Sequence, residues 1–510
     1  MANNQEARLD RFLRGVGPEG FKKLENSVVT VVMDSPVGMW YAFPFAASGI
    51  PLRMISTAQI EPPPEDFEGL KENFIGIDLA QGNLAHAYAK AFRKFNGDNI
   101  PANKIASLNA NLGFNGTDML LFASSVVIDC TTSLQSKKIA LKYARETNST
   151  LISSAVVPGY SKAALWHPEL DGASIEQALM PEMSLLEQQT LEMFGIETSN
   201  GLQLSPNAQV TRELISMVMG GLVAEEAVRA ILTDIPDKSE ELLQTPLHYK
   251  FGHNSEIFHP LYSGDELFVL ECEDFLEKAA LLYGAGSIGN MTGYSLVKMG
   301  FGRIANLDSD IIESTNIHRT ILFYGMEGKR KTHSLAKRLS AISGGATKTK
   351  AIMKKLKEEG WDPEEPYDVY VDGFDNFAAR MLVSQQGLKD DVVVASLSGR
   401  FDGFNADLYV PNHTICLDCN IGINEKGESD RAKQRQSCGR EITPQNTWMN
   451  QSVGALGALQ IASALYPGKY GTPFNGMIFH DRHQKSRLFA NEKEGTCQQG
   501  HNGEITHYDR

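Results

Sequence analysis

The chain has 510 residues, of which 42% are hydrophobic and 22% charged, and its formal net charge is −14. These values fit a globular protein of two or three domains, and the acidic balance argues against general nucleic-acid binding. No apolar run reaches the length of a membrane span, and the first residues lack the apolar core of a signal peptide. We therefore expect a cytoplasmic protein with neither nucleic acid nor a membrane as its partner.

The first half of the sequence shows the pattern of an α/β domain over residues 1–265. It begins with an arginine-containing segment at 8–14. An apolar strand then leads into the loop 33–38, and a later strand ends at Asp129 before a helix that includes Lys137. Short buried strands that alternate with helices predict a parallel sheet with helices on its faces.

The second half contains the most informative stretch of the chain. An apolar strand runs into a glycine-rich loop, and about twenty residues later the next strand ends in acids. These glycines and acids are Gly284, Gly286, Gly289, Asp308 and Asp310. Glycines at this spacing let backbone N–H groups approach phosphate, and an acid at the end of the second strand accepts hydrogen bonds from ribose hydroxyls. The pattern predicts a nucleotide-binding βαβ unit; a tight turn without a ligand is the alternative.

Further polar residues follow that a dinucleotide dehydrogenase does not need. They are Asn316, Arg319, Lys331 and, after a later strand, Asp375. A triphosphate requires a donor and cations of this kind, and a carboxylate oxygen suits Mg²⁺. These residues therefore predict ATP with Mg²⁺ as the ligand. Lys329 is the alternative to Lys331, and ordinary surface charges are the alternative for each of them.

The two halves of the sequence resemble each other. A buried strand with an acid at its end, followed by a helix with a basic residue, occurs as Asp129 with Lys137 and again as Asp372 with Arg380. Recurrence of the same strand, loop and helix order within one chain indicates duplicated domains.

The first copy lacks groups that bind nucleotide in the second. Met33 and Ser35 replace the first two loop glycines, and Thr132 replaces Asp375. Side chains at the loop positions would block the close approach of a phosphate group. We therefore expect nucleotide binding in the second half only.

The cysteines suggest two further sites. Cys416 and Cys419 form a Cys-x-x-Cys pair, which in a reducing compartment indicates a metal site or a redox pair. Cys438 lies in a charged stretch that predicts a mobile loop, and Arg435 and Arg440 beside it favour the thiolate. An incidental exposed thiol and a thiol used for sulfur transfer are the alternatives for Cys438.

Taken in order, the motifs of the second half resemble those of the ubiquitin-activating enzymes and their bacterial relatives ThiF and MoeB. G-x-G-x-x-G, D-x-D, N-x-x-R, a lysine, D-N-x-x-x-R and C-x-x-C follow one another, and residues 8–24 resemble the family's N-terminal motif. The resemblance implies two Rossmann-like ThiF-type adenylation domains in tandem, which form an intramolecular pseudo-dimer. The domain over residues 1–265 would be inactive, and the domain over residues 266–510 would bind ATP and Mg²⁺.

The resemblance also implies roles outside the nucleotide motifs. Arg11 would reach across the domain interface to the nucleotide, and Cys438, on a crossover loop at 420–450, would accept the activated protein as a thioester. The ligands of a structural zinc ion would be Cys416, Cys419, Cys497 and His501, with His480 and His483 as alternatives for the fourth. The implied partners are a ubiquitin-like protein of the β-grasp fold with a C-terminal glycine tail, and a conjugating enzyme.

Three other functions remain open from the sequence. An adenylating enzyme of the same family could stop at the adenylate and serve sulfur transfer or peptide modification. An NAD-dependent oxidoreductase would share the glycine loop but would not need Lys331, Asp375 or the cysteine pair. A non-catalytic scaffold fits the first half but not the motifs of the second.

Overall fold

A computed structural model describes most of the chain, which divides into two compact units. The described residues are 2–60, 82–96, 104–110, 124–168, 180–198, 201–233, 247–250, 267–356, 363–401, 403–436, 444–471, 476–480 and 485–489. The first unit comprises Met1–Phe251, Ile257–Val269 and Asn446–Ser452; the second comprises Gly252–Glu256, Leu270–Gln445 and Val453–Arg510. No helix among the described residues combines the length and the apolar character needed to cross a membrane.

The first unit is built on a seven-stranded sheet with the strand order β11-β8-β7-β6-β1-β2-β5. Its strands are β1 (Val29–Val32), β2 (Leu52–Ser56), β5 (Ile105–Asn109), β6 (Val126–Asp129), β7 (Thr150–Val157), β8 (Tyr160–Trp166) and β11 (Leu247–Lys250). Strands β5, β2, β1, β6 and β7 are parallel, whereas β8 and β11 are antiparallel additions. Two hairpins pair β3 (Gln59–Ile60) with β4 (Gly82–Asn83) and β9 (Gly195–Thr198) with β10 (Gly201–Leu204).

Helices cover both faces of this sheet. They are α1 (Ala2–Glu25), the 3-10 helix η1 (Pro36–Gly38), α2 (Met39–Ser48), α3 (Leu84–Asn96), α5 (Leu134–Thr147), α7 (Met180–Phe194) and α8 (Pro206–Leu232). Helix α5 packs on β6 and β7 and is itself contacted by α7, whereas α8 packs on β7, β8 and α2. Helix α8 is buried along most of its length, and its buried residues include Glu226 and Arg229, which form an ion pair at 3.1 Å.

The second unit is built on an eight-stranded sheet with the strand order β14-β13-β12-β15-β16-β17-β18-β19. Its strands are β12 (Ala279–Tyr283), β13 (Arg303–Leu307), β14 (Lys348–Ile352), β15 (Val369–Asp372), β16 (Val393–Gly399), β17 (Gly403–Tyr409), β18 (Gly476–His480) and β19 (Lys485–Phe489). The first five strands in that order are parallel, and β17 to β19 are antiparallel. The central parallel strands β12 and β15 are short buried runs, which is typical of a sheet with helices on both faces.

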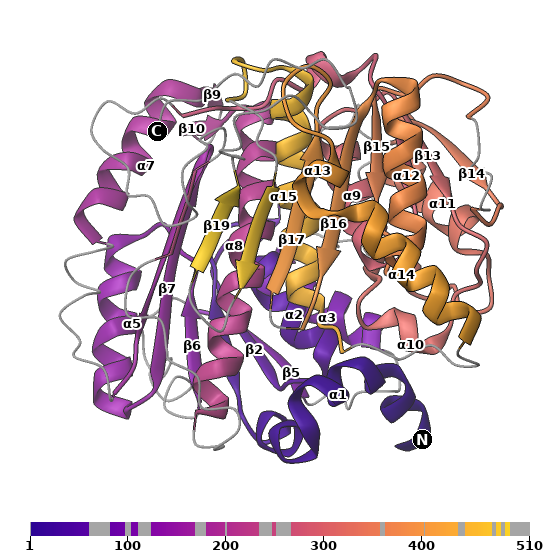
Figure 1. Cartoon of the computed structure of the whole chain (residues 1–510). Coiled ribbons are helices and arrows are strands. Elements are labelled where there is room, and N and C mark those ends of the chain that lie inside the picture. The colour runs from indigo at the N-terminus through magenta and orange to yellow at the C-terminus, as the bar shows by residue number, and fades with distance from the viewer. Residues whose placement is uncertain are drawn as a thin grey trace. The chain divides into compact units, whose positions relative to one another are not determined.

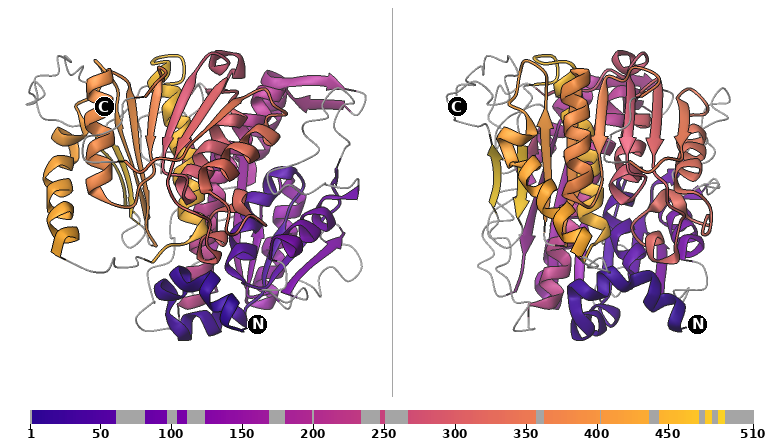
Figure 2. Two further views of the ribbon diagram at one scale, coloured as in Figure 1. Left: turned by 90° about the vertical axis from the view of Figure 1, so that its right-hand side faces the viewer. Right: turned by 45° about the vertical axis from the view of Figure 1, so that its right-hand side comes forward.

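The helices of the second unit are η5 (Cys272–Phe275), α9 (Ser287–Lys298), α10 (Ser314–Ile317), η6 (Ile321–Phe323), α11 (Lys331–Ile342), α12 (Phe377–Asp390), α13 (Leu417–Ile421), α14 (Ile423–Gln436) and α15 (Thr447–Leu465). Helix α9 packs on β12 and β16, α11 on β13 and β14, and α12 on β15 and β16. The first residues of α15, up to Ser452, belong to the first unit. Helix α14 packs against α12, and Figures 1 and 2 show both beside the strands of this sheet.

Residues 420–450 were expected to form a mobile crossover loop. Residues Ile423–Gln436 instead form helix α14, so the expectation of a loop is wrong for this part. Gly427 explains how this charged helix is held. A Cβ at Gly427 would lie 3.1 Å from the carbonyl oxygen of Phe377, so the glycine lets α14 approach α12 closely. The polar composition therefore belongs to a surface helix anchored by a tertiary contact. Cys438 lies outside the described residues.

The two sheets share one topology. Read from β5, the first sheet runs β5-β2-β1-β6-β7-β8; read from β14, the second runs β14-β13-β12-β15-β16-β17, with the same strand directions. The registers agree as well, since Asp129 pairs with Ser153 in the first unit and Asp372 pairs with Ser396 in the second. Each unit is thus a Rossmann-like α/β body.

Candidate active site

The glycine-rich loop follows β12 at the carboxyl end of the parallel strands. Gly284 has a φ of +95°, which side chains rarely adopt. A Cβ on Gly289 would lie 2.1 Å from the carbonyl oxygen of Gly284, so this glycine lets α9 start directly against the loop. At Gly286, the N-cap of α9, a Cβ would meet no described atom within 4 Å, and no described side chain caps the helix. The loop therefore leaves a helix N-terminus open to an anion.

The two acids after β13 lie against this loop. One oxygen of Asp308 accepts a hydrogen bond from the N–H of Ala285 at 2.9 Å, and the other accepts from the N–H of Asp310 at 2.9 Å. Asp310 in turn forms an ion pair with Lys331 at 3.0 Å. The ammonium group of Lys331 therefore lies beside the acids that follow β13, and the choice of Lys331 over Lys329 stays a prediction.

Asn290 ties the glycine loop to the segment that follows β13. Its amide group donates to the carbonyl oxygens of Ala285 and Gly286, at 3.1 and 3.0 Å, and its side-chain oxygen accepts from the N–H of Leu322 at 3.2 Å. Asn290 is fully buried. Sequence reasoning missed this residue; its place directly after Gly289, at the start of an apolar helix, was the available signal.

Asn316 and Arg319 lie on the segment that Asn290 anchors. The side-chain oxygen of Asn316 accepts a hydrogen bond from the N–H of Glu313 at 3.1 Å, which caps the short helix α10. Arg319 donates to the carbonyl oxygen of Thr315 at 2.6 Å. Both side chains are largely buried and are held by contacts within their own segment, so their role at the nucleotide stays a prediction.

The acidic motif at the end of β15 contains a buried hydrogen-bond network, and it continues into a turn that touches the glycine loop. The hydroxyl of Ser396 donates to Asp372 at 2.9 Å and accepts from Arg380 at 3.0 Å. Burial raises the pKa of Asp372, and the positive charge of Arg380 partly offsets that shift. Asp375 follows in the turn before α12, and this turn touches the glycine loop, because a Cβ on Gly284 would lie 3.4 Å from the backbone of Gly373. The buried network thus supports the turn that holds Asp375.

Asp407 lies on the strand next to Ser396 of this buried network and was not found from the sequence. It pairs in register with Ser396 and is only 4% exposed. Burial raises its pKa to about 7, although the charges of Arg380, Lys426 and Arg400 act in the opposite direction. Within the described residues, no hydrogen bond or close ion pair reaches its carboxyl group. The only sequence signal was an acid in the middle of an apolar strand.

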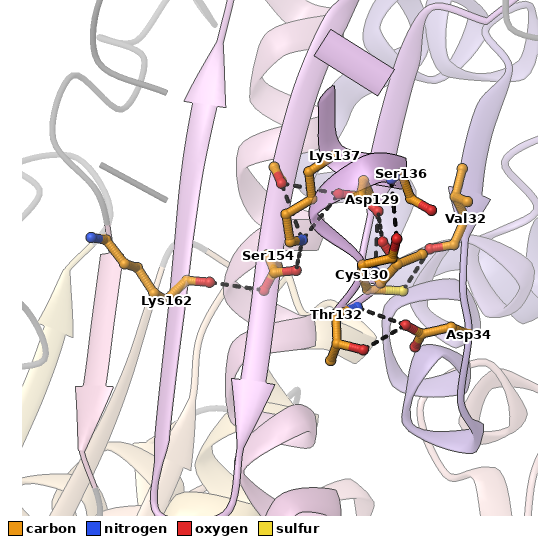
Figure 3. Close-up of polar contacts among 12 residues, drawn as sticks. Val32, Asp34, Asp129, Cys130, Thr132, Ser136, Lys137, Ser154 and Lys162 are labelled. Atoms are coloured by element: carbon orange, nitrogen blue, oxygen red, sulfur yellow. Dashed lines mark hydrogen bonds and ion pairs between the residues drawn. The ribbon is translucent and has the colours of Figure 1, made fainter. Parts of the chain in front are cut away.

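The first unit contains the same buried network with lysine in place of arginine (Figure 3). The ammonium group of Lys137 lies 3.0 Å from Asp129 and 2.9 Å from the carbonyl oxygen of Ser154, and Ser153 donates to Asp129 at 3.1 Å. The basic residue and the serine follow the aspartate by 8 and 24 residues in both units. The polar core is therefore common to both units.

The surface loop above that core differs between the units. In the first unit, one oxygen of Asp34 accepts hydrogen bonds from the N–H and the hydroxyl of Thr132, at 2.6 and 2.8 Å (Figure 3). By register, Asp34 corresponds to Ala285 of the glycine loop, and Thr132 corresponds to Asp375. A carboxylate on this loop repels a phosphate group.

The cysteine pair lies on one turn at the start of α13. Cys416 is buried and caps α13, and its sulfur accepts a contact from the N–H of Cys419 at 3.5 Å. Two sulfurs on one turn fit half of a tetrahedral zinc site. The other predicted ligands, Cys497 and His501, and the alternative His483 lie outside the described residues. His480 ends β18, and no group of three or more potential metal ligands occurs among the described side chains.

Arg11 lies on α1 of the first unit. Its neighbour Arg8 is the buried arginine of this helix: it donates to the side chain of Asn96 at 3.1 Å and lies over the ring of Phe95. Arg14 forms an exposed ion pair with Asp10. The reach of Arg11 to a nucleotide stays a prediction.

Comparison with known proteins relates part of the second half of the chain to a family. The profile of the ThiF family matches residues 263–467. The chain contains a ThiF family domain. It resembles the ThiF and MoeB enzymes and the ubiquitin-activating enzymes, in agreement with the order of motifs in the second half.

The relatives with this domain carry different biological names. The sulfur carrier protein adenylyltransferase of Thermus thermophilus is 30% identical over 144 residues, which are 28% of this chain and 53% of that protein. The catalytic subunit of the Nedd8-activating enzyme E1 of Drosophila melanogaster is 28% identical over 157 residues, 28% of this chain and 35% of that protein. The chain spans about half the length of the first curated relatives it matches. Among solved structures, E. coli MccB with ATP has 21% identity and a TM-score of 0.38, covering 45% of this chain and 68% of that one.

Proposed function

We propose that the second unit adenylates the C-terminal carboxylate of a partner protein with MgATP. The observation that supports this most directly is the meeting of an open, uncapped helix N-terminus with Asp308 and Lys331 at one edge of the sheet. The partner carboxylate attacks the α-phosphate, which yields an acyl-adenylate and pyrophosphate. No general base is required, because the nucleophile is already an anion.

Each residue of the site has a role in this reaction. The N–H groups of the glycine loop and α9 bind phosphate oxygens, and Asp308 accepts hydrogen bonds from the ribose. Lys331 and Arg319 neutralise phosphate charge, with Asn316 as a neutral donor. Lys331 exchanges its exposed partner Asp310 for phosphate, a change that costs little because surface ion pairs are weak.

Mg²⁺ fits the donor set of the turn before α12. The carboxylate of Asp375 is a hard oxygen ligand, and the turn that carries it touches the glycine loop. When bound, the ion would neutralise charge that develops on the transferred phosphate. The chain's own contribution is to hold Asp375 in position through the buried network of Asp372 and Arg380.

The identity of the partner is proposed from the relatives. The names of the matched proteins include sulfur carrier and Nedd8 enzymes, which supports a ubiquitin-like β-grasp protein with a C-terminal glycine tail. After adenylation, Cys438 displaces AMP to form a thioester that a conjugating enzyme receives. The two units form the inactive and the active half of a tandem pair, and Arg11 of the first half contacts the nucleotide.

The nucleotide assignment is tested by MgATP binding, measured by isothermal titration calorimetry on the full chain. Asp308→Ala should weaken binding at least about tenfold, because removal of a charged hydrogen-bond partner costs roughly 1.5–3 kcal/mol. The matched control is Glu364→Gln, which removes an exposed acid at the opposite, amino-terminal end of the strands. Equal affinity of wild type and Asp308→Ala would reject the site.

The thioester assignment needs a covalent test. The full chain is mixed with MgATP and a candidate β-grasp protein and run on a non-reducing gel. Wild type should form a thiol-sensitive adduct, whereas Cys438→Ala should form none and still catalyse ATP–pyrophosphate exchange. An adduct that persists in Cys438→Ala would assign the thioester to another cysteine. Exchange without any adduct in wild type would favour the adenylation-only enzyme.

A further inference from the structure

Helix α14 is joined to the start of α12, next to the acidic turn of the candidate site, by the carboxylate of Asp430. One oxygen of Asp430 accepts a hydrogen bond from the backbone N–H of Phe377 at 2.8 Å. Phe377 is the first residue of α12 and follows Asp375 by two positions. Within the described residues, Asp430 is the only hydrogen-bond partner of that N–H group. The contact therefore joins α14 to the turn on which the proposed Mg²⁺ ligand lies.

Several other contacts hold α14 in the position that this bond requires. The amide of Gln385 donates to the side chain of Asn424 at 3.1 Å, and the ammonium group of Lys426 lies 5.4 Å from the ring centroid of Phe377. The close approach at Gly427 adds backbone packing. Asp430 thus comes from a docked helix rather than from a freely moving side chain.

The hydrogen bond has a clear physical effect on the turn. The first N–H groups of a helix lack partners within the helix, and a side chain that accepts from them fixes the turn before it. Asn376 caps the N–H of Ala379 at 2.8 Å, and Asp372 accepts from the N–H of Phe374 at 3.1 Å. Asp430 accepts the hydrogen bond from the N–H of Phe377. Side chains therefore hold the backbone both before and after Asp375.

We propose that Asp430 is a positioning residue for the nucleotide site: from α14 it holds the first turn of α12, and with it Asp375. This inference rests on the proposed function of the second unit.

The structural half of the proposal is tested by hydrogen–deuterium exchange of the ligand-free full chain. Asp430→Ala should speed exchange in the peptide 374–382 by about fivefold, the effect expected for loss of one cap hydrogen bond. Asp430→Asn keeps an acceptor oxygen and should stay near wild type. The control is Glu428→Gln on the same helix, whose side chain is 65% exposed and pairs with Arg431. Unchanged exchange in Asp430→Ala would overturn the proposal.

The functional half is tested by the Mg²⁺ dependence of ATP binding in the same variants. Asp430→Ala should raise the Mg²⁺ concentration for half-maximal ATP binding by about fivefold, and Asp430→Asn should restore it. Faster exchange with an unchanged Mg²⁺ dependence would show a purely structural cap and overturn the positioning role. Failure of wild type itself to bind MgATP would instead reject the proposed function, a result distinct from any difference between variants.

Discussion

The substitution Asp407→Asn should stabilise the second unit in a pH-dependent manner. Burial raises the pKa of Asp407 to about 7, against an ordinary value of 3.8. The folded state therefore binds the proton more tightly than the unfolded state, and stability is lost as the pH rises from about 4 to about 7. At 1.36 kcal/mol per pKa unit, the ionised carboxylate costs on the order of 4 kcal/mol above pH 7. Asparagine has nearly the same shape and carries no charge, so it removes this cost.

The assay is differential scanning calorimetry of both proteins between pH 4.5 and 8.5. Asp407→Asn should raise the unfolding temperature of the second unit by on the order of 10 °C at pH 8, and by little at pH 4.5. The matched control is Asp391→Asn, an exposed acid in the left-handed conformation that asparagine also tolerates. A difference that does not change with pH would refute the reasoning, because it would show that the carboxyl group is not protonated by burial.

Three further predictions concern packing, the polar core and zinc. Gly289→Ala should abolish MgATP binding measured by calorimetry, because the added methyl group would lie 2.1 Å from the carbonyl oxygen of Gly284. Lys137→Met should destabilise the first unit by about 3–5 kcal/mol in thermal unfolding, because it leaves a buried carboxylate without its partner, whereas Lys138→Met on the same helix should have little effect. Elemental analysis should find about one zinc ion per chain, lost in Cys416→Ser; a metal-free wild type would exclude the site.

The sequence was sufficient for those parts of the site that depend on local pattern. The glycine spacing requires positive φ at Gly284 and close packing at Gly289, and both follow from the residues of one loop. Asp308 was found because an acid at the end of the second strand must lie beside the first βα loop in any parallel sheet of this order. Local geometry and strand order together therefore predict how the glycine loop and Asp308 lie at the carboxyl ends of the parallel strands.

Residues that act through tertiary contacts could not be found in this way. Asp430 lies in a charged stretch that composition assigns to a loop, and only the packing of Gly427 on α12 makes it part of a helix that faces the Asp375 turn. Asp407 becomes informative only through its register with Ser396 on the neighbouring strand, because it is not part of any sequence motif. The composition of a segment indicates how polar it is, but it does not indicate which helix or strand packs against it.

Comparison of the two units explains why one copy can change its chemistry without losing its fold. The buried aspartate, basic residue and serine recur with the same separations, because removing one member would leave an uncompensated charge in the core. In the loop above, the first unit has a partly exposed Asp34 where the second unit has a buried Ala285. A carboxylate therefore lies on the loop that corresponds to the proposed phosphate loop of the second unit, and Thr132 holds it there with two hydrogen bonds. The buried network thus stabilises the fold of each unit, whereas the residues of the loop above it determine the affinity for a nucleotide.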